Sequence, residues 1–253
     1  MKRAFDEPRL MPCFDRFTFA VNPPHACPYF MNATPDPTSA RPLPTFMHES
    51  PLYQFGRIIC RIGTTLAFDL KTYGVENVPK TGGVLIVSNH QSFLDPVLLT
   101  VKIPRPASFL AKSDLFGSHK LFTKIITTLN AFPIRQTGSA AGAIKETVKR
   151  LQDGHMLVMF PEGGRAERDE VEAMQGGVGL IARQAGPDVK VIPAAINGAF
   201  GAWSRHRKRP RAWPIRVKYG RPLELNGMRP AAAVEAIGEN IRRLFAELKT
   251  QNG

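Results

Sequence analysis

The sequence predicts an α/β protein, a single domain in which helices flank a mixed, largely parallel sheet. Two observations lead to this prediction. Short apolar runs such as 84–88 and 156–160 show no alternation with polar residues, which is typical of strands buried on both faces. Helical segments separate most of these runs, and strands that alternate with helices form largely parallel sheets.

Residues 1–50 form a leader that we expect to be disordered. The leader is rich in proline from Pro8 to Pro44, and proline removes backbone donors and favours extended chain. No long apolar core follows Lys2 and Arg3, so the segment lacks the pattern of a secretory signal. We assign residues 51–253 to the folded domain, because about 200 residues suffice for one hydrophobic core.

The domain begins with an amphipathic helix over residues 51–70. Its apolar residues recur every three or four positions, whereas Arg57 and Arg61 give it a polar edge. The helix is too short and too charged to span a bilayer, which needs about 20 apolar residues. Such a helix either lies in the plane of a membrane interface or packs its apolar face on a core. We predict the interfacial position.

The other elements follow from the spacing of apolar residues and from turn residues between them. The first half contains a short strand or turn at 72–79, a strand at 84–88, a helix from about 95 to 100, a strand at 108–111, a helix at 121–129 and a strand at 131–135. The second half contains a helix at 139–153, a strand at 156–160, a helix at 177–185, strands at 189–196 and 216–220, and a closing helix at 231–249.

The chain is strongly basic, with a net charge of +13, which implies an anionic partner. Its densest basic run is 205–211, flanked by Trp203 and Trp213. This run is either a solvated loop or a docking surface for anionic lipid. A nucleic-acid-binding protein, with the two tryptophans as stacking residues, is the alternative from another class.

Metal and disulfide chemistry find little support in the sequence. Cys13, Cys27 and Cys60 form no CxxC pair, and no HExxH segment is present. We therefore predict no disulfide framework and no metal site.

Polar groups follow three of the predicted strands, and the carboxyl ends of parallel strands meet at one edge of a sheet. These groups are the pair His90 and Asp95, then Arg135, and then the run Glu162-Gly163-Gly164-Arg165. A histidine held by a carboxylate is a general base near neutral pH. Guanidinium groups and glycine amides bind phosphate. The set therefore suits acyl transfer to a hydroxyl on a phosphate-bearing acceptor, with Glu162 orienting that hydroxyl or a neighbouring arginine.

Simpler interpretations of the same residues stay open. His90 and Asp95 fit a surface histidine beside a helix start, and Arg135 fits a strand-end surface arginine. The glycine pair fits a plain turn. A hydrolase that activates water with the same histidine and carboxylate is a further alternative.

Four runs resemble, in order and spacing, the four motifs of the glycerolipid acyltransferases: 89–95, 132–135, 160–165 and 191–195. The resemblance covers about residues 72–225. It implies that His90 and Asp95 are catalytic and that the substrate-binding residues are Asn89, Arg135, Glu162, Gly163, Gly164, Arg165 and Pro193. Pro193 would shape the acyl or acceptor pocket.

The resemblance also implies the partners. The donor would be a thioester of coenzyme A or acyl carrier protein, and the acceptor a lysophospholipid, most simply 1-acylglycerol 3-phosphate. No cofactor, metal or nucleic acid is expected. The residues of the basic run fit docking on anionic lipid best, and the phosphates of coenzyme A or the acidic face of acyl carrier protein are further candidate partners for it. The protein would act on an anionic membrane surface, at the cytoplasmic face of the inner or plasma membrane. One departure is notable, because Gly164 and Ala166 stand where the family usually has hydroxyl residues. A different lysolipid acceptor is therefore an alternative.

Overall fold

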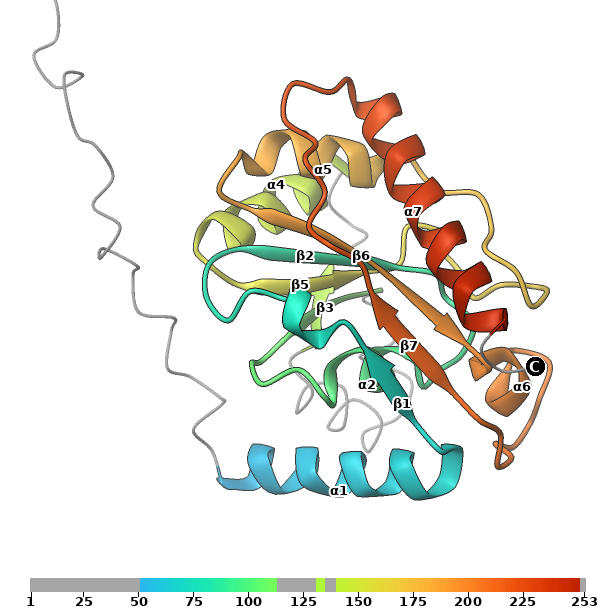
Figure 1. The fold of residues 1–253 in the computed structure, drawn as a ribbon. Helices are drawn as coiled ribbons and strands as arrows, with labels where there is room; N and C mark the ends of the chain where they lie inside the picture. The colour runs from blue at the N-terminus through green and yellow to red at the C-terminus, as the bar shows by residue number, and fades with distance from the viewer. Residues whose placement is uncertain (1–50, 113–130, 135–139, 251–253) are drawn as a thin grey trace, which may run out of the picture. The chain divides into compact units, whose positions relative to one another are not determined.

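The computed structural model describes residues 51–112, 131–134 and 140–250 (Figure 1). The predicted leader over 1–50, the predicted helix at 121–129 and Arg135 lie outside these residues. The following description concerns the domain that begins at Pro51.

A seven-stranded sheet forms the centre of the domain, in the order β1-β7-β6-β2-β5-β3-β4. Neighbouring strands run parallel except β6 and β7, which are antiparallel. The prediction of a mixed, largely parallel sheet is therefore confirmed. The strands are β1 (Lys71–Tyr73), β2 (Val84–Ser88), β3 (Ser108–Lys112), β4 (Ala131–Ile134), β5 (Met156–Met159), β6 (Lys190–Asn197) and β7 (Arg216–Tyr219).

Helices cover both faces of the sheet, as Figure 1 shows. One face packs on α4 (Ala140–Gln152), α5 (Gly177–Ala185) and α7 (Pro230–Thr250). The other packs on α2 (Asp95–Thr100) and α6 (Ala199–Trp203). The short α6 and a 3-10 turn at Val75–Asn77 are elements that the sequence pattern missed, because each is too short to show a period.

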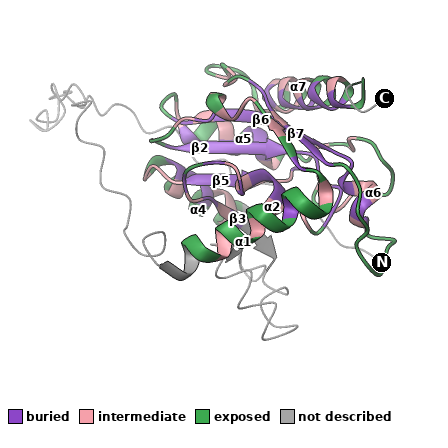
Figure 2. Ribbon diagram, turned by 60° about the horizontal axis from the view of Figure 1, so that its bottom comes forward, coloured by how far each residue is buried: buried purple, intermediate pink, exposed green. Residues whose placement is uncertain are grey.

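The strand β2 lies at the centre of the core, between β6 and β5. All five of its residues are buried (Figure 2). Val84 and Ile86 face the cluster that contains α2 and α6, whereas Leu85 and Val87 face the cluster with α4, α5 and α7. Burial on both faces is the reason that this strand is apolar from Val84 to Val87.

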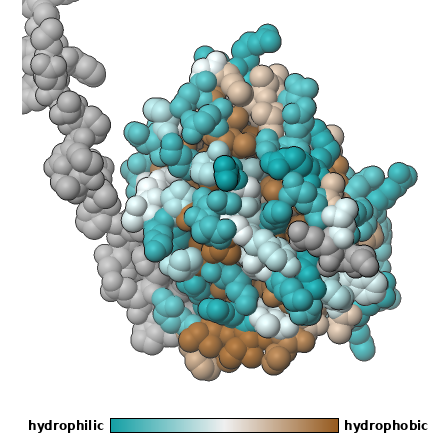
Figure 3. Space-filling model, in the orientation of Figure 1, coloured by the Kyte–Doolittle hydropathy of each residue, from teal (hydrophilic) through white to brown (hydrophobic). Residues whose placement is uncertain are grey.

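The helix α1 (Pro51–Phe68) turns its apolar face away from the domain. Phe55 is 62% exposed and Leu66 is 80% exposed, and they share this face with Ile58, Ile59 and Ile62. The apolar band at the bottom of Figure 3 lies where Figure 1 shows α1. The inward side is mixed, since Cys60 and Phe68 pack on the core, the Arg57 guanidinium donates to the Ile103 carbonyl at 2.5 Å and Thr64 is buried. Among the helices in the described part of the chain, none is long and apolar enough to cross a membrane.

Candidate active site

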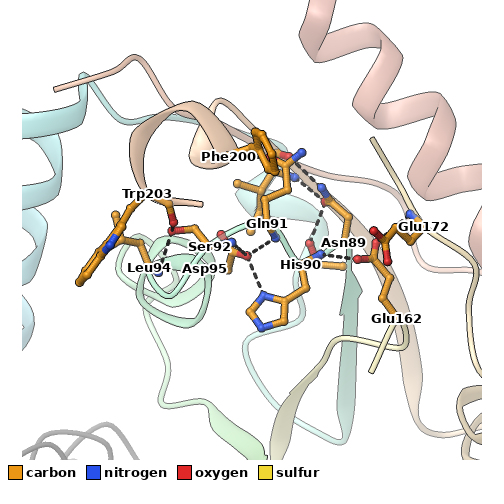
Figure 4. A network of polar contacts seen from close by, with 12 residues as sticks. Asn89, His90, Gln91, Ser92, Leu94, Asp95, Glu162, Glu172, Phe200 and Trp203 are labelled. Carbon is orange, nitrogen blue, oxygen red and sulfur yellow. Dashed lines mark hydrogen bonds and ion pairs between the residues drawn. The ribbon is translucent and has the colours of Figure 1, made fainter. Parts of the chain in front are cut away.

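The turn between β2 and α2 folds around the carboxylate of Asp95 (Figure 4). Asp95 begins α2 and is fully buried. Its Oδ2 accepts the backbone N–H groups of Gln91, at 2.6 Å, and Ser92, at 2.7 Å. The same oxygen lies 2.8 Å from Nδ1 of His90. One carboxylate oxygen thus shapes the turn and also holds the imidazole.

The other ring nitrogen of His90 has no hydrogen-bond partner among the described residues, so it can act as a base. A hydrogen on Nδ1 points to Asp95, so the lone pair of the neutral ring lies on Nε2. The ring stacks on Phe160, with 4.1 Å between centroids and 18° between planes. The His90 side chain remains 20% exposed. Phe160 therefore packs on one face of the ring and Asp95 holds Nδ1, while part of the ring stays accessible.

Glu162 joins the same turn from β5, the neighbour of β2. Its Oε2 accepts the backbone N–H of His90 at 3.2 Å, and its Oε1 accepts the N–H of Glu172 at 3.3 Å (Figure 4). Burial raises the pKa of the Glu162 carboxyl to about 8, although both backbone bonds act to lower it. Both oxygens are thus occupied by backbone donors, whereas the sequence suggested a substrate hydroxyl or an arginine as partner. In this structure Glu162 positions the histidine.

The glycine turn after β5 has one constrained and one open position. Gly163 has a φ of +77°, and a Cβ there would lie 2.0 Å from Nε2 of Gln175. Gly164 is exposed, and a Cβ there would meet no atom within 4 Å. Ala166 is fully buried, and its N–H donates to the His90 carbonyl at 2.7 Å. The turn therefore packs directly on the catalytic segment, with Gly164 on its open side.

Arg165 follows this turn and lies against an exposed aromatic ring. Its guanidinium carbon is 3.4 Å from the centroid of Phe93, which is 48% exposed. Burial, and to a lesser degree the nearby Arg205, lowers the pKa of Arg165. Its buried Nη1 has no hydrogen-bond partner among the described residues. One donor of this guanidinium is thus unsatisfied among the described residues, although the atom itself is shielded from solvent.

Two residues predicted to bind substrate are buried and make structural contacts, and their substrate role stays a prediction. Asn89 is fully buried, and its side-chain amide donates to the Ile196 carbonyl at 2.9 Å and accepts the Ile196 N–H at 2.8 Å. It therefore joins the end of β2 to β6. Pro193 is buried within β6, close to Gly220 and on the α7 face of the sheet. Phe160, on which His90 stacks, packs on the opposite face, so Pro193 does not line the site at His90. Arg135 follows β4, at the edge of the sheet, and lies outside the described residues.

Contacts that the sequence did not predict complete the site. Gln91, buried between His90 and Ser92, donates to Asp169 at 2.8 Å and accepts the Phe200 N–H at 3.4 Å. It links the loop after β5 to α6. These partners are 78 and 109 residues away, so no local signal could have identified them.

No group of three or more histidine, cysteine or acidic residues that could hold a metal ion lies in the described ranges. The arrangement is thus an imidazole base with a buried carboxylate behind it, beside a glycine turn and an arginine. This set can remove a proton from a hydroxyl close to a bound anion.

Comparisons with known proteins point the same way. A family model described as Acyltransferase matches residues 69–197, just over half of the chain. The 1-acyl-sn-glycerol-3-phosphate acyltransferase of Bacillus subtilis is 26% identical over 205 residues, covering 78% of this chain and 98% of that protein. A probable 1-acyl-sn-glycerol-3-phosphate acyltransferase of Mycoplasma pneumoniae is 29% identical, covering 58% of this chain and 59% of that protein.

Structural similarity supports the fold. The crystal structure of the 1-acyl-sn-glycerophosphate acyltransferase PlsC from Thermotoga maritima superposes with a TM-score of 0.66 and 24% identity. The match covers 78% of this chain and 80% of that one. The chain spans nearly all of the Bacillus subtilis relative but under half of the one from Cocos nucifera, where the match covers 46% of that protein.

Proposed function

Because this chain belongs to the acyltransferase family, we propose that it moves a fatty acyl group from a thioester donor to the free hydroxyl of a lysophospholipid. The relatives named as 1-acyl-sn-glycerol-3-phosphate acyltransferases favour 1-acylglycerol 3-phosphate as the acceptor. The observation that carries the proposal is the His90–Asp95 contact, with Nε2 left free at the carboxyl edge of the sheet.

The proposed reaction uses His90 as base and then as acid. Nε2 takes the proton of the acceptor hydroxyl, and the hydroxyl oxygen attacks the carbonyl carbon of the thioester. The tetrahedral intermediate collapses by breaking the C–S bond, and the leaving thiolate takes the proton from the imidazolium. Asp95 holds the ring in the required tautomer and stabilises its charged form. Acid–base help of this kind is worth about 10²–10⁴-fold in rate.

Arg165 is the described residue best placed to bind the acceptor phosphate. It follows the glycine turn that packs on His90, and its Nη1 is unpaired within the described residues. A guanidinium forms strong charge-assisted bonds with phosphate oxygens. Arg135 remains a second candidate by resemblance. The open position at Gly164 leaves room beside Arg165 for an acceptor headgroup.

The direct test is to incubate purified protein with an acyl thioester and lysophosphatidate and to follow the formation of phosphatidate. We expect His90→Ala to abolish transfer with folding intact, because the buried Asp95 carboxylate keeps its two backbone donors, Gln91 and Ser92, when the ring is removed. His155→Ala is the matched control, since His155 precedes β5 at the opposite edge of the sheet. More than a few per cent of residual activity in His90→Ala would exclude the general-base role. Release of free fatty acid without transfer would indicate a hydrolase.

We further propose that α1 docks on a membrane surface and brings the site to its lipid substrates. Moving a large apolar side chain from water into an apolar medium yields about 1.5–3 kcal/mol. The outward stripe of α1 offers five such side chains, and its opposite side contacts the domain through Arg57, Cys60 and Phe68. The arrangement fits a helix lying in the interface plane.

Vesicle sedimentation tests this proposal. We expect Ile59→Ser combined with Leu66→Ser to weaken binding to phosphatidylglycerol vesicles at least about tenfold, because two exposed apolar side chains are lost. Ala67→Ser on the same helix is the control and should bind as the unaltered protein does. Equal binding by all three proteins would show that α1 is not the docking element.

A further inference from the structure

The connection between α6 and β7 forms a braced basic loop, which we define as residues 205–211. All seven residues are exposed. The indole N–H of Trp203 donates to the Arg207 carbonyl at 3.2 Å. At the other end, Nε of Arg211 donates to the Gly201 carbonyl at 2.8 Å. The loop is therefore held to α6 at both ends, although its side chains reach into solvent.

The second tryptophan also braces the loop. The Arg211 guanidinium carbon lies 4.1 Å from the ring centroid of Trp213. The indole also lies against Gly201, where a Cβ would be 2.6–2.9 Å from ring atoms. Trp213 is thus in contact with two parts of the loop and α6, although 42% of its surface stays exposed.

The beginning of the basic loop contacts the glycine turn beside the catalytic segment. Nη1 of Arg205 forms an ion pair with Glu167 at 2.5 Å and donates to the Arg165 carbonyl at 3.3 Å. His206 also contacts Glu167, at 3.2 Å. These contacts fix the loop relative to His90, because Ala166 donates to the His90 carbonyl.

The tip of the loop carries three consecutive cations, Arg207, Lys208 and Arg209. None of them contacts a carboxylate of a described residue, unlike Arg205 and His206. Three like charges held together on a braced tip repel one another until an anion binds between them. The tip is therefore a preformed site for a compact polyanion at a fixed position relative to the base.

We propose that Arg207, Lys208 and Arg209 bind the phosphates of an acyl-coenzyme A donor. The inference rests on the proposed acyl transfer and selects the nucleotide-linked thioester as donor. Coenzyme A carries several phosphate charges at the end remote from its thioester, which suits three adjacent cations. Docking of an acidic carrier protein is the competing interpretation, because Trp213 stays 42% exposed beside the charges, and the choice of donor separates the two. An anionic bilayer presents its charge over a plane rather than at one point.

The test compares donors that differ in their phosphates. The triple variant Arg207→Ala/Lys208→Ala/Arg209→Ala is assayed with acyl-coenzyme A, with acyl-dephospho-coenzyme A and with acyl-pantetheine. We expect its KM for acyl-coenzyme A to rise at least about tenfold with kcat unchanged, because the variant loses charge-assisted hydrogen bonds to the donor phosphates. The rise should be smaller for the dephospho donor and absent for acyl-pantetheine. The same loss of three charges in Lys145→Ala/Lys149→Ala/Arg183→Ala, on the α4–α5 face, should leave all three KM values unchanged.

Other outcomes would overturn the assignment. Unchanged donor KM together with weaker vesicle binding would make the tip a lipid-headgroup site, and a raised KM for acyl carrier protein alone would make it a protein-docking site. Calorimetric binding of coenzyme A to the unaltered protein and to the triple variant decides the proposal independently of turnover. If neither donor supports transfer, the proposed function fails, but binding of coenzyme A that the triple variant loses would still support the site.

Discussion

The raised pKa of Glu162 leads to a prediction about stability and pH. The carboxyl has a pKa of about 8 in the folded protein, against 4.5 as its ordinary value, because burial disfavours the charged form. The folded state therefore binds this proton more tightly than the unfolded state does. Its contribution to stability is present in full below pH 4.5 and is lost as the pH rises to about 8. We expect Glu162→Gln to remove this dependence.

The magnitude follows from the shift and from the surroundings of the carboxyl. One pKa unit corresponds to about 1.4 kcal/mol, so a displacement from 4.5 to about 8 sets an upper bound near 5 kcal/mol. Because the side chain is partly exposed, we expect about half of that bound. At low pH the glutamine loses one of the two backbone bonds, worth about 1 kcal/mol. The unaltered protein should thus be the more stable at pH 5 and the less stable at pH 9.

Urea unfolding at pH 5, 7 and 9 measures this difference. Glu239→Gln, which changes an exposed carboxyl on α7, corrects for the general effect of removing one negative charge. A difference between Glu162→Gln and the unaltered protein that stays constant from pH 5 to pH 9 would refute the reasoning. The carboxyl would then titrate alike in the folded and unfolded states.

Two further substitutions test how the site is built. Asn89→Ala should lower the free energy of unfolding by about 2–4 kcal/mol, because it leaves the buried N–H and carbonyl of Ile196 unpaired; an unchanged urea midpoint would contradict this. Gly163→Ala should lower it by about 1–2 kcal/mol, since a φ of +77° is unfavourable for a residue with a Cβ. Gly164→Ala is the matched control and should stay within about 0.5 kcal/mol in the same urea experiment, because a Cβ there meets open space.

The sequence predicted the fold class and most elements because segments that are buried in the fold consist of apolar residues, which local inspection of the sequence detects. Apart from Ser88 at the end of β2, the strands β2 and β5 consist of apolar residues, since both faces of the sheet are covered. The prediction that polar groups after these two strands come together is confirmed by the bond between His90 and Glu162. Short elements such as α6 were missed, because they depend on the neighbouring strands rather than on a repeating pattern.

What the sequence by itself determined is which segments are amphipathic, which are buried, and which polar residues follow the strands. Only the tertiary structure decided where those residues point. A helical period shows that α1 has an apolar face but not that the face turns outward. Strand pairing brings the Asn89 side chain to the Ile196 backbone and puts Pro193 on the α7 face. Glu162 and the basic loop contact residues far away in the chain, and the spacing of nearby residues cannot predict such contacts.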